Sequence, residues 1–195
     1  MFPINMTIAS TAGRSKAQSD EASLVEAARR DYSAFEQLYR RYVTRVYRYC
    51  LTRTNNTRDA EDLTAQTFEA ALESIKRYRG KGSFAAWLFS IAWRKCNDHH
   101  RRRYKTQLEP LELAHGLPDI HAPDPEQRAR QQEILECVKL TWPYLSEDRR
   151  EVIRLRFWAG LNTAETAKVM GRSRGAVKML LSRAIADLKE RCLDE

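Results

Sequence analysis

Hydrophobic residues recur every three to four positions along most of the chain, and no segment shows the period of two that is typical of a half-buried strand. In the first half, this spacing predicts a short helix around 20–30 and a second helix that begins at Ser33. Ser33 and Glu36 have the spacing of a capping box, in which two side chains satisfy free backbone N–H groups. The pattern as a whole predicts an all-α protein.

A third helix is expected at about 58–77. Its apolar residues form one buried stripe, which leaves a polar row outside that consists of Asp62, Gln66, Glu69 and Glu73. A run of charges is most often a solvated face of a helix. An acidic row could equally dock on a basic helical partner, so two interpretations remain open.

A fourth helix is expected from Ser83 to Arg103. Its hydrophobic spacing predicts a core side that holds Phe84, Trp87, Leu88, Ile91 and Ala92, and an opposite side that holds Ala86, Ser90, Trp93, Asn97, His100 and Arg101. A tryptophan opposite the core belongs either to a second packing surface or to a stacking platform for bases, and the basic run 101–103 favours nucleic acid. The loop at 76–83, with two glycines, Tyr78 and four cations, is either a polar turn or a contact to a nucleic-acid backbone.

The segment 161–184 predicts two short helices around a tight turn. Asn162 and Glu165 form a capping box at the start of the first helix, Gly171 ends that helix, and Ser173 caps the second one. The outward face of the turn and the second helix consists of Arg172, Ser173, Arg174, Gly175, Lys178, Met179, Ser182 and Arg183. This face carries no acidic residue, so the segment is predicted to be a helix-turn-helix that enters a DNA major groove.

Residues 104–125 contain four of the six prolines and carry mostly acidic charges. Proline disfavours helix at its own position and at the one before it, so an irregular connection is expected. It is either a plain flexible linker or a functional segment, as long loops often are. The sequence thus predicts a disordered tail at 1–19 and two helical domains, at 20–103 and 126–195, that are joined by a flexible linker.

Charge and cysteine content bear on the partner and the compartment. The net charge is +8 and the pI about 9.5, which favours a polyanionic partner. Cys50, Cys96, Cys137 and Cys192 are scattered without a CxxC pair, which suggests free thiols in a reducing cytoplasm. No signal peptide and no apolar run of about 18 residues is present, so a cytoplasmic protein without membrane insertion is expected.

Candidate chemistry is sparse. Cys96, Asp98, His99 and His100 come closest to a metal cluster, but adjacent histidines point to different helix faces and no second ligand group stands at zinc-site spacing. No catalytic constellation is recognisable either. We therefore expect no metal, no cofactor and no enzymatic activity, and a monomer in the absence of partners.

Four blocks of the chain, in order, resemble the sigma-70 family of transcription initiation factors, and specifically its small extracytoplasmic-function (ECF) group. The blocks are AFEQLYRRYVTRVYRYC, DAEDLTAQTFEAAL, RYRGKGSFAAWLFSIAWRKCNDHHRRR and LSEDRREVIRLRFWAGLNTAETAKVMGRSRGAVKMLLSRA. The resemblance covers nearly all of 20–192. It implies a sigma-2-like first domain and a sigma-4-like second domain, with bacterial RNA polymerase core, promoter DNA and an anti-sigma factor as partners.

The same resemblance assigns roles to residues of this chain. Asp62, Gln66, Glu69 and Glu73 would face the polymerase core, and the outward face of the helix-turn-helix would read the minus-35 element. The minus-10 element would be opened and read by Tyr78, Arg79, Lys81, Ser83, Ser90, Trp93, Arg94, Asn97 and Arg101.

Two other functions remain open at this point. A stand-alone helix-turn-helix regulator would bind closed duplex, usually as a dimer, and would not require the segment 58–103. A sigma mimic would sequester an anti-sigma factor without touching promoters, but the basic outward face at 172–183 argues against a decoy.

Overall fold

The computed structural model describes the backbone of residues 11–80, 82–103 and 136–193, and within these ranges it is all-helical. The first lobe consists of α1 (Thr11–Ala28), α2 (Tyr32–Thr54), α3 (Thr57–Ser74), the short 3-10 turn η1 (Ile75–Arg77) and α4 (Phe84–Arg103). The second lobe begins with a helical segment at 136–141 and the turn η2 (Trp142–Tyr144). It continues with α6 (Glu147–Ile153), the π-helical turn η3 (Arg154–Trp158), α7 (Thr163–Met170) and α8 (Arg174–Leu193).

Helix starts follow local capping chemistry, with one correction. The predicted cap at Ser33 is wrong, because Asp31 is the N-cap of α2 and accepts the Ser33 N–H at 2.9 Å. Ser33 instead lies in the first turn and donates its hydroxyl to Asp31 at 2.6 Å. The carboxylate of Asp31 is an equally good cap and stands two positions earlier. The predicted cap at Ser173 is present, since its hydroxyl accepts the N–H group of Ala176 at 3.1 Å. The hydroxyl of Ser83 accepts the N–H group of Ala86 at the same distance, at the start of α4.

The predicted tail at 1–19 also needs correction. Helix α1 begins at Thr11, so 11–19 continue the helix that was expected only around 20–30. Residues 11–19 include two alanines and three long polar residues, which favour helix, but no large apolar residue from which periodicity could detect a stripe. Residues 1–10 lie outside the described part of the chain, as do the predicted linker at 104–125 and the predicted start of the second domain at 126–135.

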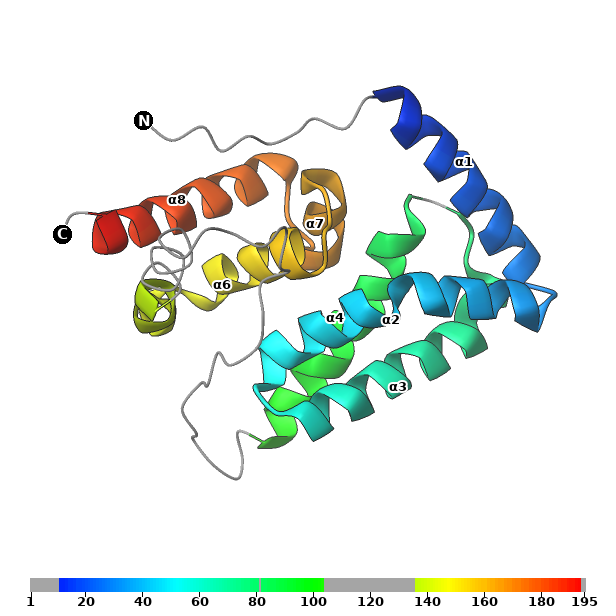
Figure 1. Cartoon of the computed structure of the whole chain (residues 1–195), viewed down its shortest axis with the longest axis horizontal. Helices are drawn as coiled ribbons and strands as arrows, with labels where there is room; N and C mark the ends of the chain where they lie inside the picture. The colour runs from blue at the N-terminus through cyan, green and yellow to red at the C-terminus, as the bar shows by residue number, and fades with distance from the viewer. Residues whose placement is uncertain (1–10, 81, 104–135, 194–195) are drawn as a thin grey trace, which may run out of the picture.

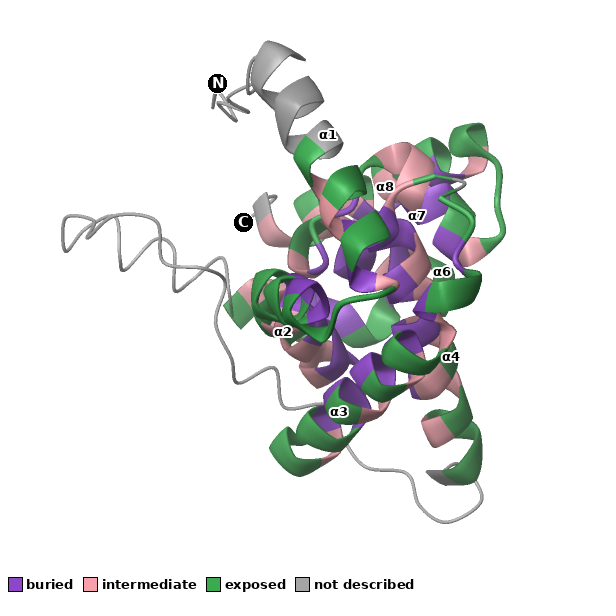
Figure 2. Cartoon of the chain, turned by 90° about the vertical axis from the view of Figure 1, so that its right-hand side faces the viewer, coloured by how far each residue is buried: buried purple, intermediate pink, exposed green. Residues whose placement is uncertain are grey.

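The two lobes pack directly against each other. Figure 1 shows α6, α7 and α8 grouped on one side of the molecule and α2, α3 and α4 on the other, with α7 next to α4. The buried faces of the first-lobe helices turn toward the interior (Figure 2). Their core continues into the second lobe, where it includes Leu155, Ala159, Leu161 and Val169. A second cluster around Trp142, Val152, Val177 and Ala184 holds α6, α7 and α8 together.

Candidate nucleic-acid interface

The helix-turn-helix consists of α7 and α8, and its local sequence explains its shape. Asn162 accepts the backbone N–H groups of Ala164 and Glu165, while Glu165 accepts the Asn162 N–H at 2.7 Å, so the predicted capping box is confirmed. Gly171 ends α7 with φ +62°, a left-handed conformation that glycine adopts without steric cost. The short turn at 171–173 then connects α7 to α8.

The outward face of this unit is exposed along its whole length. Val177 and Ala184 are buried against α6 and α7, whereas all eight residues that were predicted to face outward are exposed, namely Arg172, Ser173, Arg174, Gly175, Lys178, Met179, Ser182 and Arg183. Arg172 forms an ion pair with Asp148 of α6 at 2.9 Å. The other cations of this face are Arg174, Lys178 and Arg183. They lie beside Met179, which is 55% exposed. The geometry leaves a cationic, acid-free helix face open to a polyanion.

The loop before α4 is held by a buried tyrosine. Tyr78 is only 8% exposed and donates its hydroxyl to the Gly82 carbonyl at 2.8 Å. Its ring packs on Phe84 and Trp87, with the Trp87 centroid at 4.9 Å. Burial raises the pKa of this phenol, so it stays a hydrogen-bond donor at neutral pH. In this arrangement Tyr78 shapes the loop and offers no free ring face, while Arg79 next to it is exposed.

The outer side of α4 is less open than the sequence suggested. Ala86, which was expected opposite the core, is fully buried, because α7 packs against α4 and gives this helix a second buried side. Trp93 is half-buried and packs against the core, so the second-packing-surface interpretation holds in this arrangement. Arg94 and Arg101 are exposed, Ser83 and Ser90 are half-buried, and Lys81 lies outside the described residues.

A buried charge network at the contact between the lobes was missed by the sequence analysis. Arg53 of α2 pairs with Glu147 at 2.6 Å and with Glu151 at 2.8 Å, both on α6. Arg154 pairs with the same two carboxylates at 2.7 and 3.3 Å. Tyr49 donates its hydroxyl to Glu151 at 2.6 Å. Tyr49 and Arg53 lie 94 to 102 positions before their partners on α6, so no local motif could reveal these contacts.

Electrostatics within the network match this pairing. Burial by itself would raise the pKa of Glu147, but the charges of Arg154 and Arg53 outweigh it and lower the pKa. Burial and the neighbouring Glu151 raise the pKa of Tyr49 well above its ordinary value, so the phenol remains protonated as a donor. Arg53 also donates to the side-chain oxygen of Asn97, so this predicted minus-10 residue is engaged within the protein.

Other contacts between the lobes surround the network. Arg45 of α2 donates through Nε to the Ala159 carbonyl at 3.0 Å, next to the left-handed Gly160. At another point of contact, Gly82 lies close to α7. A Cβ atom added to Gly82 would lie 2.6 Å from the amine of Lys168. The loop that precedes α4 therefore touches the first helix of the helix-turn-helix.

The acidic row on α3 lies on the outer surface of the first lobe. Asp62, Glu69 and Glu73 are exposed and Gln66 is half-buried. They project from one side of the helix, because their positions fall within about 60° of one another at 100° per residue. Leu72, which is 40% exposed, adds an apolar side chain beside them.

The expectation of four free thiols is wrong for one pair. Cys137 and Cys192 form a disulfide with their Cα atoms 5.6 Å apart, although 55 positions separate them in sequence. Only the fold brings them together, so their spacing gave no signal. Cys50 and Cys96 are free and buried. Among the described residues, no cluster of histidines, cysteines and carboxylates suits a metal ion, and no helix is long and apolar enough to cross a membrane.

A helix-turn-helix with a cationic face, joined to a helical lobe with a glycine-containing basic loop, is typical of a DNA-binding protein. Sigma-70 region 2 matches residues 38–106, and sigma-70 region 4 matches residues 144–190. The chain is 34% identical over 183 residues to the ECF RNA polymerase sigma factor BldN of Streptomyces coelicolor, which covers 90% of this chain and 68% of that protein. It is 30% identical over 157 residues to the RNA polymerase sigma factor YlaC of Bacillus subtilis, over 80% of this chain and 91% of YlaC. The chain therefore belongs to the ECF group of the sigma-70 family.

Solved structures agree with this assignment. The structure of CnrH in complex with the cytosolic domain of CnrY aligns with a TM-score of 0.64 at 27% identity, over 87% of this chain and 95% of that one. The sigma factor RpoE, crystallised with the anti-sigma factor NepR from Bartonella quintana, shares the fold with a TM-score of 0.61 at 21% identity, over 83% and 98% of the two chains. The protein is an ECF RNA polymerase sigma factor that directs promoter-specific transcription initiation and is not an enzyme. Membership of this family selects the sigma-factor function over a stand-alone helix-turn-helix regulator and a sigma mimic.

Proposed function

We propose that the two lobes divide promoter recognition between them. Residues 126–195 would form the domain that reads the minus-35 element, and residues 20–103 the domain that binds core polymerase and the minus-10 element. The observation that carries the first assignment is the exposed, acid-free face of α8, on which Lys178 and Arg183 stand without an ion pair among the described residues. Cations on such a helix contact phosphates and base edges in the major groove.

For the minus-10 element, we propose that exposed cations make the first contacts. Arg79, Arg94 and Arg101 line the open side of the loop and α4, where they can meet the DNA backbone. The half-buried Trp93 would then receive a base from the melted strand, which requires that its packing partners move. Lys81, Ser83, Ser90 and Asn97 remain part of this proposed surface.

We further propose that the structure represents a closed form that must open on a promoter. The two elements are about 25 base pairs apart, or roughly 85 Å of B-form helix at 3.4 Å per pair. In the structure α4 and α7 touch, and the Arg53 network bridges the lobes. Surfaces on two helices in contact cannot reach both elements at once, so promoter binding requires the lobes to separate.

The acidic row on α3 is proposed as the core-polymerase surface. Its exposure, and the apolar Leu72 beside it, suit a docking site better than a purely solvated face does. An anti-sigma factor is a second proposed partner, because the similar CnrH was solved in complex with the cytosolic domain of CnrY.

Transcription with purified core polymerase tests this division of roles. Run-off assays on genomic fragments, followed by mapping of start sites, should give starts only when the chain is present, with shared sequence elements upstream of them. Replacing the upstream element should abolish binding of the chain through its second lobe, and replacing the nearer element should block opening. Transcription start sites that share no upstream sequence element would overturn the proposal that α8 reads the minus-35 element.

A further inference from the structure

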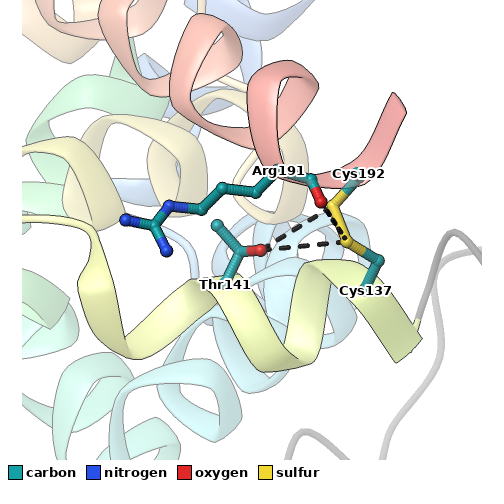
Figure 3. The surroundings of a disulfide bond; sticks show 4 residues. All are labelled: Cys137, Thr141, Arg191 and Cys192. Carbon is teal, nitrogen blue, oxygen red and sulfur yellow. Dashed lines mark hydrogen bonds between the residues drawn. A yellow bond between two sulfur atoms is a disulfide. The ribbon is translucent and has the colours of Figure 1, made fainter. Parts of the chain in front are cut away.

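The disulfide closes a covalent ring around the whole helix-turn-helix. Cys137 lies in the helical segment 136–141, before α6, and Cys192 lies in the last turn of α8. The ring therefore contains α6, η3, α7 and α8. Figure 3 shows the bond joining the helical segment to the end of α8. A cross-link of this span restricts the unfolded chain and stabilises every element inside it.

The segment that carries Cys137 lies largely at the surface. Of the residues 136–141, only Thr141 is buried, and Leu140 is 74% exposed. The packed core of the second lobe begins one residue later, at Trp142. The disulfide therefore attaches this largely exposed segment covalently to α8.

The surroundings of the two sulfurs can serve both oxidation states. The Thr141 hydroxyl lies 3.8 Å from the Cys137 sulfur and 3.7 Å from the Cys192 sulfur (Figure 3). The Arg191 carbonyl lies 3.5 Å from the Cys137 sulfur, where it can accept the proton of a thiol once the bond is reduced.

The other two cysteines provide an internal contrast. Cys50 and Cys96 are fully buried in the first lobe, and the Cys96 thiol donates to Cys50 at 3.9 Å. This hydrogen bond, together with burial, raises the pKa of the Cys50 thiol well above its ordinary value. A thiol of this kind forms little thiolate and reacts slowly. Cys137 and Cys192 are half-buried at the surface and accessible to exchange.

We propose that Cys137 and Cys192 form a reversible thiol–disulfide site that sets the stability of the minus-35 reading unit. Two molecules of a low-molecular-weight thiol reduce the bond: the first thiolate forms a mixed disulfide and releases one cysteine thiolate, and the second releases the other cysteine. The products are two protein thiols and one small disulfide, and the reverse sequence restores the cross-link. Disulfides in a reducing compartment are usually transient or redox-sensing, which fits an accessible pair.

The consequence rests on the proposed role of α8. With the bond formed, the second lobe should stay folded and bind minus-35 duplex at temperatures at which the reduced lobe has begun to unfold. Loss of the cross-link should lower the thermal midpoint of this lobe by about 10–30 °C. The change in stability does not depend on which DNA the lobe reads.

The test equilibrates the full-length chain in thiol/disulfide buffers of graded ratio. Alkylation and mass spectrometry should show a Cys137–Cys192 bond that forms and breaks reversibly, while Cys50 and Cys96 stay reduced throughout. Hydrogen exchange at 136–141 should be faster in the reduced chain. A pair that stays reduced at the most oxidising ratio, or identical exchange and thermal midpoint in both states, would overturn the proposal.

Variants and DNA binding complete the test. Cys137→Ser and Cys192→Ser should each behave like the reduced chain and lose the response to the thiol ratio, with unchanged helicity at low temperature. Binding of a minus-35 duplex should persist to a higher temperature in the oxidised wild type than in either variant. If all three proteins lose DNA binding at the same temperature, the disulfide does not affect DNA binding and that part of the proposal is refuted. If no duplex binds in any state while the bond and the stability shift are present, the role of α8 fails and the thiol–disulfide site stands.

Discussion

Lys178 and Arg183 are exposed cations of α8, and no described carboxylate pairs with either of them. Their counterparts in the interior, Arg53 and Arg154, are almost fully buried and share two carboxylates. A cationic side chain thus serves one of two purposes in this protein, depending on the groups that surround it. An unpaired surface cation gains most from a phosphate, whereas a buried one must be neutralised within the protein.

Removal of Lys178 or Arg183 should weaken binding to minus-35 duplex. We expect Lys178→Ala and Arg183→Ala each to lose about 1–3 kcal/mol of binding free energy, and to lower the salt slope by about one unit where the lost contact is to a phosphate. Lys189→Ala is a matched control, because Lys189 is an exposed cation farther along α8. Titrations at several salt concentrations measure both quantities, and equal affinity and slope in the two variants and the control would show that another face binds DNA.

Substitutions of Trp93 and of Tyr78 should have different effects, the first on promoter opening and the second on stability. Trp93→Ala should impair opening on an intact promoter more than on a pre-melted one, since stacking is worth about 1–3 kcal/mol per base and bases become free only after melting. Tyr78→Phe should mainly lower stability, by about 0.5–1.5 kcal/mol, because it removes the hydrogen bond to Gly82. Permanganate footprinting and thermal unfolding measure the two effects. An equal Trp93→Ala defect on both templates would argue against a role in opening.

At the level of elements, α3 presents its acidic row outward while its buried face holds the first lobe together. Asp62→Lys with Glu69→Lys leaves the buried side unchanged, so folding should survive. Affinity for core polymerase should fall and depend less on salt, while minus-35 binding stays the same. Glu61→Lys serves as a control, because Glu61 is an exposed carboxylate of the same helix outside the row. The measurement is competition between each variant and the wild type for core polymerase. If the double variant competes as well as the wild type, the acidic row is only a solvated face.

Helices with strong local signals could be predicted from the sequence. The capping box at Asn162 and Glu165 and the left-handed Gly171 depend only on neighbours within a few positions, so the helix-turn-helix was predicted correctly. The cap of α2 was predicted two positions too late, because Asp31 and not Ser33 caps this helix. Ala86 and Tyr78 were misjudged because their burial depends on α7 and on a loop contact that periodicity cannot detect.

For the whole molecule, contacts distant in sequence decide the arrangement. The Arg53 network and the disulfide each join residues tens of positions apart, so neither left a pattern in the sequence. The two-lobed, all-helical architecture was predictable, since it follows from local helix signals and a proline-rich connection. How the lobes pack against each other was not, because it depends on which surfaces complement one another once both are folded.

The closed packing should weaken in acid. The pKa of Glu147 is lowered in this arrangement because Arg154 and Arg53 favour its charged form. A depressed pKa contributes stability that is present above the ordinary value of 4.5 and is lost as the pH falls through the lowered value. We therefore expect small-angle scattering to show a growing radius of gyration as the pH drops below 4.5, and a constant one between neutral pH and that point. Expansion that begins near neutral pH would assign the closure to other groups.

Arg53→Met should open the lobes at neutral pH. The substitution keeps much of the side-chain volume and leaves Glu147 and Glu151 paired with Arg154, so the second lobe retains its own network. Loss of the Arg53 contacts to Glu147 and Glu151 removes the ion pairs that join α2 to α6, which should shift the closed form toward an open one. Arg40→Met is a control, because Arg40 forms only an exposed pair with Glu36. Scattering should show expansion for the first variant alone.

If the lobes open on a promoter, the distance between them must differ between the free and the promoter-bound chain. Fluorescence energy transfer between a probe on the exposed side of α3 and one on the exposed side of α8 reports this separation in the free chain, in the complex with core polymerase and on promoter DNA. High transfer in the free chain is expected, followed by its loss on the promoter as the lobes move toward elements roughly 85 Å apart. Transfer that stays high in a transcribing complex would contradict the account, because one closed body would then be reading both elements.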